Sequence, residues 1–182
     1  GHTKVPSEIN VAINFEEKIG EKLDQISLGL DYALILGKSG KAYIYDMQDA
    51  VTPVKTEDGL ILENIKEVSA GNGYSVLVTK DNKVYSFGDN DYEKLGVSNA
   101  NSEGGIQESE NAILNEKVEN IERVTAGYNH TSVYDKNGNI YTWGRRREWR
   151  IRKYRKLQLF STTISRKKWS TKKYNKFNPS KR

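Results

Sequence analysis

Apolar and polar positions repeat along the chain in three similar segments, residues 26–45, 68–87 and 124–143. In each segment an apolar run leads to a polar pair, and the alternation of apolar and polar residues after it ends in aromatic residues. Such a pattern on both sides of a turn predicts a β-hairpin. The polar pairs tolerate positive φ and predict tight type I′ turns. These pairs are Ser39-Gly40, Asp81-Asn82 and Asn137-Gly138.

The three segments also agree at four positions: a glycine, a ring three residues later, a tyrosine after fourteen residues and an aromatic residue after sixteen. These residues are Gly29, Tyr32, Tyr43 and Tyr45, then Gly71, Tyr74, Tyr85 and Phe87, then Gly127, His130, Tyr141 and Trp143. The glycine indicates a bulge, a bend or a close approach of the backbone. A single hairpin cannot bury its aromatic face, so the pattern predicts stacked copies.

The spacing of the copies is uneven, because Gly29 and Gly71 are 42 residues apart and Gly71 and Gly127 are 56 apart. The extra residues coincide with a polar stretch at 99–111. That composition predicts a surface loop between two repeats. Such insertions usually lie on one rim of a repeat array, where binding tends to occur.

The order Val-x-Ala-Gly-x-x-His/Tyr, then a turn, then Val-Tyr-x-Trp/Phe-Gly and Leu-Gly resembles the regulator of chromosome condensation repeat. Residues 68–96 match almost throughout, including Gly88, Leu95 and Gly96. Residues 124–144 match up to Gly144. The first copy diverges, because Asp46 stands where the others have this glycine. The resemblance covers about residues 20–144 and implies a β-propeller of four-stranded blades.

We therefore expect an all-β fold, a partial β-propeller of about three blade-like repeats with a basic C-terminal tail. The expected division is an incomplete repeat end at 1–22, three repeats at 23–144 and the tail at 145–182. Three repeats are too few to close a ring of this kind. The chain thus looks like a fragment of a longer, bacterial repeat protein, and we expect its exposed blade edges to favour self-association.

Charge divides the chain at Gly144. The net charge of +5 is the sum of −10 over residues 1–144, with 13 Lys+Arg and 23 Asp+Glu, and +15 over residues 145–182, with 16 Lys+Arg and one acid. Two compositions are joined here, and they need separate interpretations. The acidic repeats favour a basic partner or a basic patch on a partner.

The tail does not continue the repeat. Back-translation with A/T-rich codons and a skip of one nucleotide after Gly144 restores a Leu-Gly pair at the spacing that Leu95 and Gly96 have from Gly88. We hypothesise that the reading frame shifts at this point. Translated as written, the tail has many like charges and no long apolar periodicity, which predicts disorder.

A basic tail also offers a second interpretation of function, which is nucleic-acid binding. Arginine and lysine attract phosphate without sequence preference, and aromatic residues can stack on bases. The arginines that would contact phosphate are Arg145, Arg146, Arg147, Arg150 and Arg152.

Catalytic chemistry has little support in the sequence. The chain has no cysteine, and His130 has no evident nucleophile or carboxylate partner. Because tyrosines fill its equivalent positions, we expect His130 to pack in the fold and bond to backbone. Residues 89–93 are rich in acids, but the glycine and glutamate that a calcium-binding EF-hand loop requires are absent. We expect no catalytic residue, metal site or cofactor.

The sequence thus favours a non-catalytic protein-interaction module whose partner is unidentified. Nucleic-acid binding through the tail is the first alternative. The second is guanine-nucleotide exchange, because the resemblance implies an exchange factor for a small GTPase that also binds chromatin. No exchange-site residue can be matched onto this chain, and fold alone does not carry function. We expect no membrane span, and secretion or a bacterial cell surface is favoured over the cytoplasm.

Overall fold

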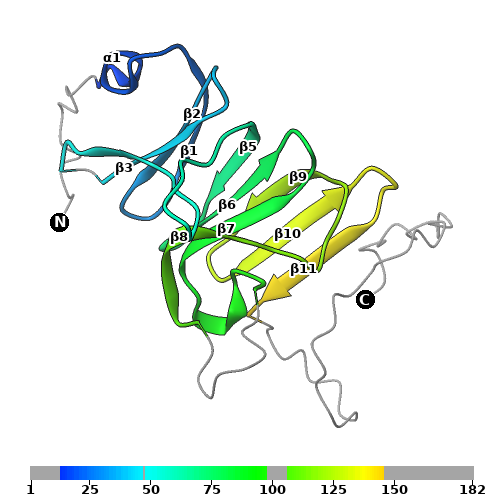
Figure 1. Cartoon of the computed structure of the whole chain (residues 1–182). Helices are drawn as coiled ribbons and strands as arrows, with labels where there is room; N and C mark the ends of the chain where they lie inside the picture. Colours follow the sequence, from blue (N-terminus) through cyan, green and yellow to red (C-terminus); the bar gives the residue numbers. More distant parts are fainter. Residues whose placement is uncertain (1–12, 47, 98–105, 146–182) are drawn as a thin grey trace, which may run out of the picture.

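The computed structural model describes residues 13–46, 48–97 and 106–145. They form eleven strands, one α-helix and one 3-10 helix (Figure 1). The elements are α1 (Phe15–Ile19), β1 (Leu23–Leu28), β2 (Ala33–Gly37), β3 (Ala42–Tyr45), β4 (Val51–Pro53), β5 (Ile65–Ala70), β6 (Tyr74–Thr79), β7 (Val84–Asp89), η1 (Asp91–Glu93), β8 (Glu108–Leu114), β9 (Ile121–Ala126), β10 (His130–Asp135) and β11 (Ile140–Gly144). The expected all-β class is confirmed.

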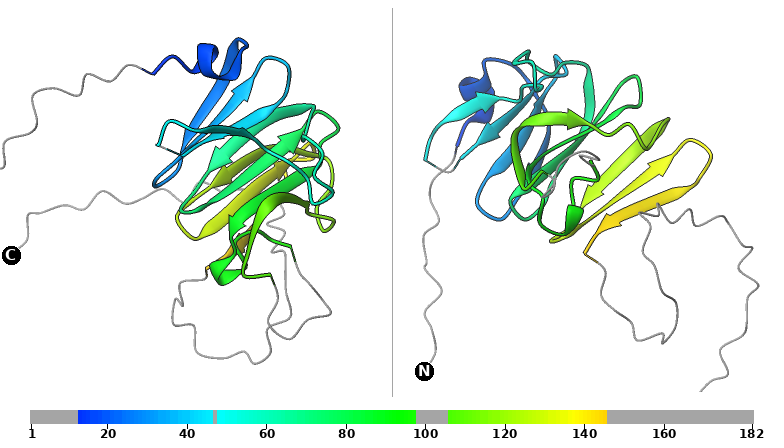
Figure 2. Two further views of the ribbon diagram at one scale, coloured as in Figure 1. Left: turned by 60° about the vertical axis from the view of Figure 1, so that its left-hand side comes forward. Right: turned by 60° about the horizontal axis from the view of Figure 1, so that its bottom comes forward.

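The strands form three antiparallel sheets, and each follows the chain order of its strands. The first sheet is β1-β2-β3-β4, the second is β5-β6-β7-β8 and the third, among the described residues, is β9-β10-β11. The sheets stack side by side along the sequence, with β5 beside β1 and β9 beside β5 (Figures 1 and 2). Each predicted hairpin is the second and third strand of one sheet, and we refer to the sheets as blades 1, 2 and 3.

The hydrophobic core lies between the blades, because the inner strands bury alternate side chains against the two neighbouring sheets. Leu34 and Leu36 of blade 1 pack with Val68, Leu77 and other residues of blade 2. On the other face of blade 2, a second cluster is shared with blade 3. It contains Tyr74, Val76, Val78, Val84, Ile121, Val124 and Val133. Alternate residues of β6 therefore face two different cores, which explains why every residue of the strand is buried, the polar Ser75 and Thr79 included.

A short helix covers the outer face of blade 1. Asn14 caps α1, and Gly20 ends it in the left-handed conformation. Phe15 packs edge-on against Tyr45, with ring centroids 5.3 Å apart, and Ile19 joins the same apolar cluster. Residues 13–22, which were expected to belong to an incomplete repeat end, thus cover the outer face of blade 1. The corresponding face of blade 2 is covered by blade 1.

The hairpin turns differ from the predicted type I′. Only the second residue of each pair has positive φ, at Gly40, Asn82 and Gly138. The amide N–H of that residue donates to the carbonyl three residues earlier, as Gly40 does to Gly37 over 3.0 Å. This is a type I turn closed by a left-handed residue, the geometry of a longer hairpin loop. The prediction of type I′ turns failed because glycine and asparagine are favoured both in type I′ turns and in this longer loop, so the residue pairs do not distinguish the two.

The predicted loop at 99–111 is only partly a loop. Residues 108–111 form the first half of β8, which pairs with Gly88 and Asp89 of β7. Polar residues suit this outer strand, because its first half is exposed or half-buried. Residues 98–105, and all of the tail beyond Arg145, lie outside the described residues.

Candidate functional site

The repeated glycine is required by the ring that follows it. A Cβ placed on Gly71 would lie 2.3 Å from Cε1 of Tyr74, and one on Gly29 would lie 2.2 Å from Cε1 of Tyr32. On Gly127 the nearest atom would be Cε1 of His130, at 2.6 Å. The ring therefore lies directly against the glycine backbone in all three blades, and this close approach accounts for the Gly-x-x-Tyr/His spacing.

The tyrosine hydroxyl ties each blade to the next. The hydroxyl of Tyr32 donates to the Tyr74 carbonyl, and that of Tyr74 donates to the His130 carbonyl over 2.6 Å. Burial raises the pKa of Tyr32 to about 12 and raises that of Tyr74 in the same direction. Both hydroxyls stay protonated as donors, so the repeated ring is a connection between blades.

We expect Tyr74→Phe to lower the free energy of unfolding by about 1–2 kcal/mol, because this buried side chain loses its bonds to the His130 carbonyl and to the Thr131 hydroxyl. Tyr134→Phe is the matched control, since this tyrosine is exposed and its hydroxyl bonds to no described residue, so its change should be within about 0.5 kcal/mol. Urea unfolding followed by circular dichroism measures both. Equal effects of the two substitutions would contradict the connecting role.

His130 occupies the same position on the last described blade. Its ring packs over Gly127 but is exposed, and no hydrogen bond joins the ring to a residue in the described ranges. The expected packing is present, whereas the expected bond to backbone is not. The ring lies on the side of blade 3 that faces away from blade 2, where Tyr32 and Tyr74 on their own blades meet a following blade.

A second set of bonds between blades was not predicted from the sequence. The Ser27 hydroxyl accepts from the Ala70 N–H over 2.9 Å, and the Ser69 hydroxyl accepts from the Ala126 N–H over 2.8 Å. The signal was present in the aligned segments, where Ser, Ser and Thr precede the glycine by two residues. Small hydroxyl residues at this place link the innermost strands of neighbouring blades.

Lys94 is the most unexpected residue of the signature region. Its side chain is 0% exposed, forms an ion pair with Asp89 and donates to the Asn72 carbonyl over 3.1 Å. Its own carbonyl accepts from the Trp143 ring nitrogen over 2.9 Å and from the Thr131 hydroxyl over 2.8 Å. This lysine therefore joins the turn after β7 to the inner loop of blade 2 and to blade 3.

The other signature residues are structural in position. The aromatic residues at the fourteenth and sixteenth places all face the preceding unit: Tyr43 and Tyr45 pack in the cluster with α1, Tyr85 and Phe87 face blade 1, and Tyr141 and Trp143 face blade 2. Leu95 is buried in the second core. Gly96 has positive φ and lies directly against the Trp143 ring.

The three glycine loops form a shallow, largely apolar depression at one end of the stack. We call this the glycine-loop surface, and its volume is about 310 Å³. It is lined by Leu28, Gly29, Leu30, Ala70, Gly71, Asn72, Ala126, Gly127 and Tyr128. Leu28, Leu30 and Tyr128 are 67%, 69% and 65% exposed. Exposed large apolar residues that gather at one place mark an interaction surface more often than scattered ones do.

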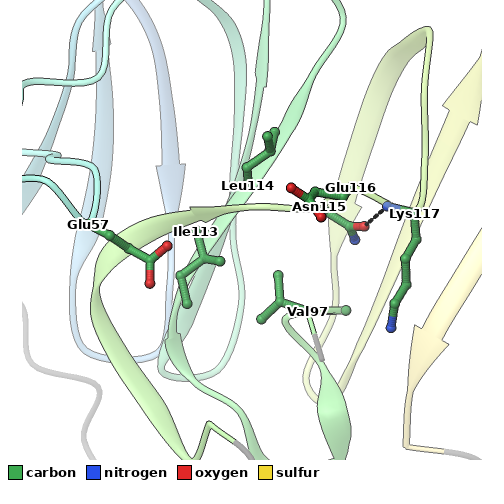
Figure 3. A pocket seen from close by; sticks show the side chains of 8 residues that line it. Glu57, Val97, Ile113, Leu114, Asn115, Glu116 and Lys117 are labelled. Carbon is green, nitrogen blue, oxygen red and sulfur yellow. Dashed lines mark hydrogen bonds between the residues drawn. The ribbon is translucent and has the colours of Figure 1, made fainter. Parts of the chain in front are cut away.

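A second depression, of about 260 Å³, lies beside β8. Figure 3 shows Val97, Ile113 and Leu114 along it, with the Lys117 N–H bonded to the Asn115 side chain at 2.9 Å. Its charged lining residues, Glu57 among them, are exposed. The lining has no histidine or hydroxyl side chain, and its two glutamates are exposed, so neither has the burial that would tune it for acid–base catalysis.

The remaining predicted contacts are partly described. The Arg145 guanidinium stacks over the Tyr92 ring at 4.8 Å, an ordinary cation–π contact. The other four arginines proposed to meet phosphate lie outside the described residues. Within the part of the chain that the structure describes, no group of acids and histidines could hold a metal, and no helix could cross a bilayer.

Comparison with known proteins finds a family model that matches one of the blades. Residues 65–93, most of blade 2 with its glycine and tyrosine, match the family model of the regulator of chromosome condensation (RCC1) repeat. The segment spans β5, β6, β7 and η1. The resemblance inferred from the sequence is therefore confirmed.

Curated relatives carry the same kind of repeat. The chain is 27% identical to the ultraviolet-B receptor UVR8 of Arabidopsis thaliana over 137 residues, which are 69% of this chain and 30% of the receptor. It is 34% identical to the human regulator of chromosome condensation over 84 residues, 46% of this chain and 19% of that protein. The chain thus spans a third or less of these relatives.

Solved structures support the fold. Human WBSCR16 matches with a TM-score of 0.57 at 16% identity, covering 68% of this chain and 33% of that one. Prp20p of Saccharomyces cerevisiae matches with a TM-score of 0.54 at 20% identity, covering 67% and 33%. At these identities the likeness concerns the fold, and it confirms propeller-type blades.

Proposed function

Because the chain carries regulator of chromosome condensation repeats, we propose that it is a non-catalytic protein-interaction module. The observation that carries the proposal is the glycine-loop surface, where Leu28, Leu30 and Tyr128 are exposed together. A rigid stack of blades with loops at its end suits binding without chemistry, since binding residues concentrate on loops held by a scaffold.

The relatives agree with this interpretation in kind. The structure of Prp20p is described with its binding properties to Gsp1p and histones, and another relative is the guanine nucleotide exchange factor SRM1 of Saccharomyces cerevisiae. Both descriptions concern proteins that act on or bind other proteins. We do not carry over exchange activity, because none of the described residues is matched to an exchange site.

Selection of peptides on the immobilised full chain tests the proposal. A display library of random peptides should yield sequences that bind the chain and are lost on a Leu30→Ser/Tyr128→Ser variant. The matched control is Leu60→Ser, which changes a leucine with 65% exposure in the loop between β4 and β5. If no sequence is enriched, or if enriched peptides bind all three proteins equally, the proposed function is wrong.

We also propose that the chain is part of a longer bacterial repeat protein. Two faces support this. Ile26 of β1 is exposed, whereas the corresponding Val68 and Val124 are buried against a preceding blade. On blade 3, Tyr134 and Ile140 are exposed where the corresponding residues of blade 2 are buried. Sequencing of the gene and its flanks tests the proposal, because further repeats in any frame should adjoin the coding region.

A further inference from the structure

We propose, as an extension that rests on the proposed function, that the glycine-loop surface binds a lysine- or arginine-rich segment of a partner protein that carries one large apolar side chain. The inference starts from the direction of the strands. In antiparallel sheets, alternate connections lie at the same end, so the three glycine loops share one end with the connections after β3, β7 and β11. Figure 1 shows η1 and the end of β11 together at this end.

The two ends of the stack carry different charge. In the described loops of the glycine-loop end, five acids and two cations give a net charge of −3, and Lys18 of α1, which pairs with Asp49 at 2.5 Å, reduces it to −2. The acids are Asp31, Asp46, Asp49, Asp91 and Glu93, and the cations are Lys94 and Arg145. In the described loops of the opposite end, seven acids face eight lysines, a net charge of +1.

The negative charge near the surface is available to a ligand. Lys94 is buried and paired with Asp89, so it does not neutralise the loop acids. Asp31, Asp91 and Glu93 are exposed and form no ion pair with a residue of the described ranges. Asp31 directly follows Leu30 in the sequence. A basic ligand would therefore meet complementary charge around an apolar centre, which favours encounter and excludes acidic partners.

The centre of the surface offers apolar contact and one free amide. The side chain of Asn72 is half-buried between the loops that hold Leu30 and Tyr128, and it makes no hydrogen bond to any described residue. An amide can donate to and accept from one peptide unit of an extended ligand. An aromatic or aliphatic anchor in a depression with a charged rim is the usual layout of a protein-binding hot spot.

A synthetic peptide tests this directly. The probe is a short fluorescent peptide of alternating arginine and glycine around one tryptophan, added to the full chain at low ionic strength. We expect Tyr128→Ser and Leu30→Ser each to weaken binding about tenfold, the loss typical of a central anchor contact. Leu60→Ser at the opposite end should leave it unchanged. Asp31→Asn should weaken binding several-fold at low salt and much less at high salt, because salt screens exposed charges.

Changes in the peptide separate the two parts of the proposal. A probe with alanine in place of tryptophan, or with glutamate in place of arginine, should bind weakly. If acidic or neutral apolar peptides bind this surface as well as the basic probe, the partner class is wrong while the proposed function stands. If the unchanged chain fails to bind, and changing Arg145, Arg146, Arg147, Arg150 and Arg152 to glutamine creates binding, the surface is occupied by the chain's own tail and the partner assignment is overturned.

Discussion

Gly88→Ala should lower the free energy of unfolding by about 3 kcal/mol or more. Gly88 has φ of +100°, where a side chain is strained by about 1–2 kcal/mol. A Cβ at this position would also lie 2.4 Å from the Gly73 carbonyl oxygen and 2.6 Å from Cα of Tyr74. Both atoms belong to the backbone where the glycine loop of blade 2 meets β6. Relief would require the strands to separate, and overpacking of this kind adds about 1–3 kcal/mol.

A second glycine with positive φ serves as a control, because its substitution introduces backbone strain without a steric clash. Gly138 has φ of +83°, and a Cβ there would meet nothing within 4 Å. Gly138→Ala should therefore cost only about 1 kcal/mol. Urea unfolding of the full-length variants, followed by circular dichroism, gives both values. A cost for Gly88→Ala as small as that for Gly138→Ala would show that the blade can open at this point, and the close approach would not be rigid.

Much of the fold follows from the sequence because the hairpin is a local structure. The glycine and its ring three residues later, as in Gly71 and Tyr74, identify the bend, and the turn residues place the strands around it. The fourth strand of blades 1 and 2 has no such signal. β4 and β8 are polar or short outer strands, and they are fixed by pairing with β3 and β7 rather than by their own residues.

The parts of the candidate surface that escaped prediction depend on contacts across blades. Leu30 and Tyr128 gather at one surface because three loops that are far apart in the chain meet at one end. Neither residue occupies one of the four repeated positions, so an alignment of the repeats does not identify them as candidates for a binding surface. In the same way, Lys94 reads as an ordinary surface lysine until the folded turn places it under Asn72 and beside Asp89.

Loss of the Asp89 carboxylate should be costly because it leaves a buried ammonium without its counter-charge. We expect Asp89→Ala to lower the free energy of unfolding by about 2–4 kcal/mol, since removal of one partner from a buried pair typically costs about 3–5 kcal/mol and Asp89 itself is partly exposed. Asp81→Ala is the matched control. Asp81 pairs with Lys83 at 3.0 Å, both side chains are exposed, and such pairs contribute about 1 kcal/mol or less.

The pH dependence gives a second measure of the same pair. Partial burial opposes ionisation of Asp89, but hydrogen bonds from Lys94 and from the Asp91 N–H outweigh it and hold its pKa below the usual range. A folded-state pKa below the unfolded value stabilises the fold above about pH 4, and this stability is lost as the pH falls through the folded-state pKa. The difference in unfolding free energy between the unchanged chain and Asp89→Ala should therefore shrink in acid. Lys94→Met should recover part of the stability of Asp89→Ala, because it removes the unpaired charge. If the cost of Asp89→Ala is no larger than that of Asp81→Ala and is independent of pH, the buried pair does not hold this turn.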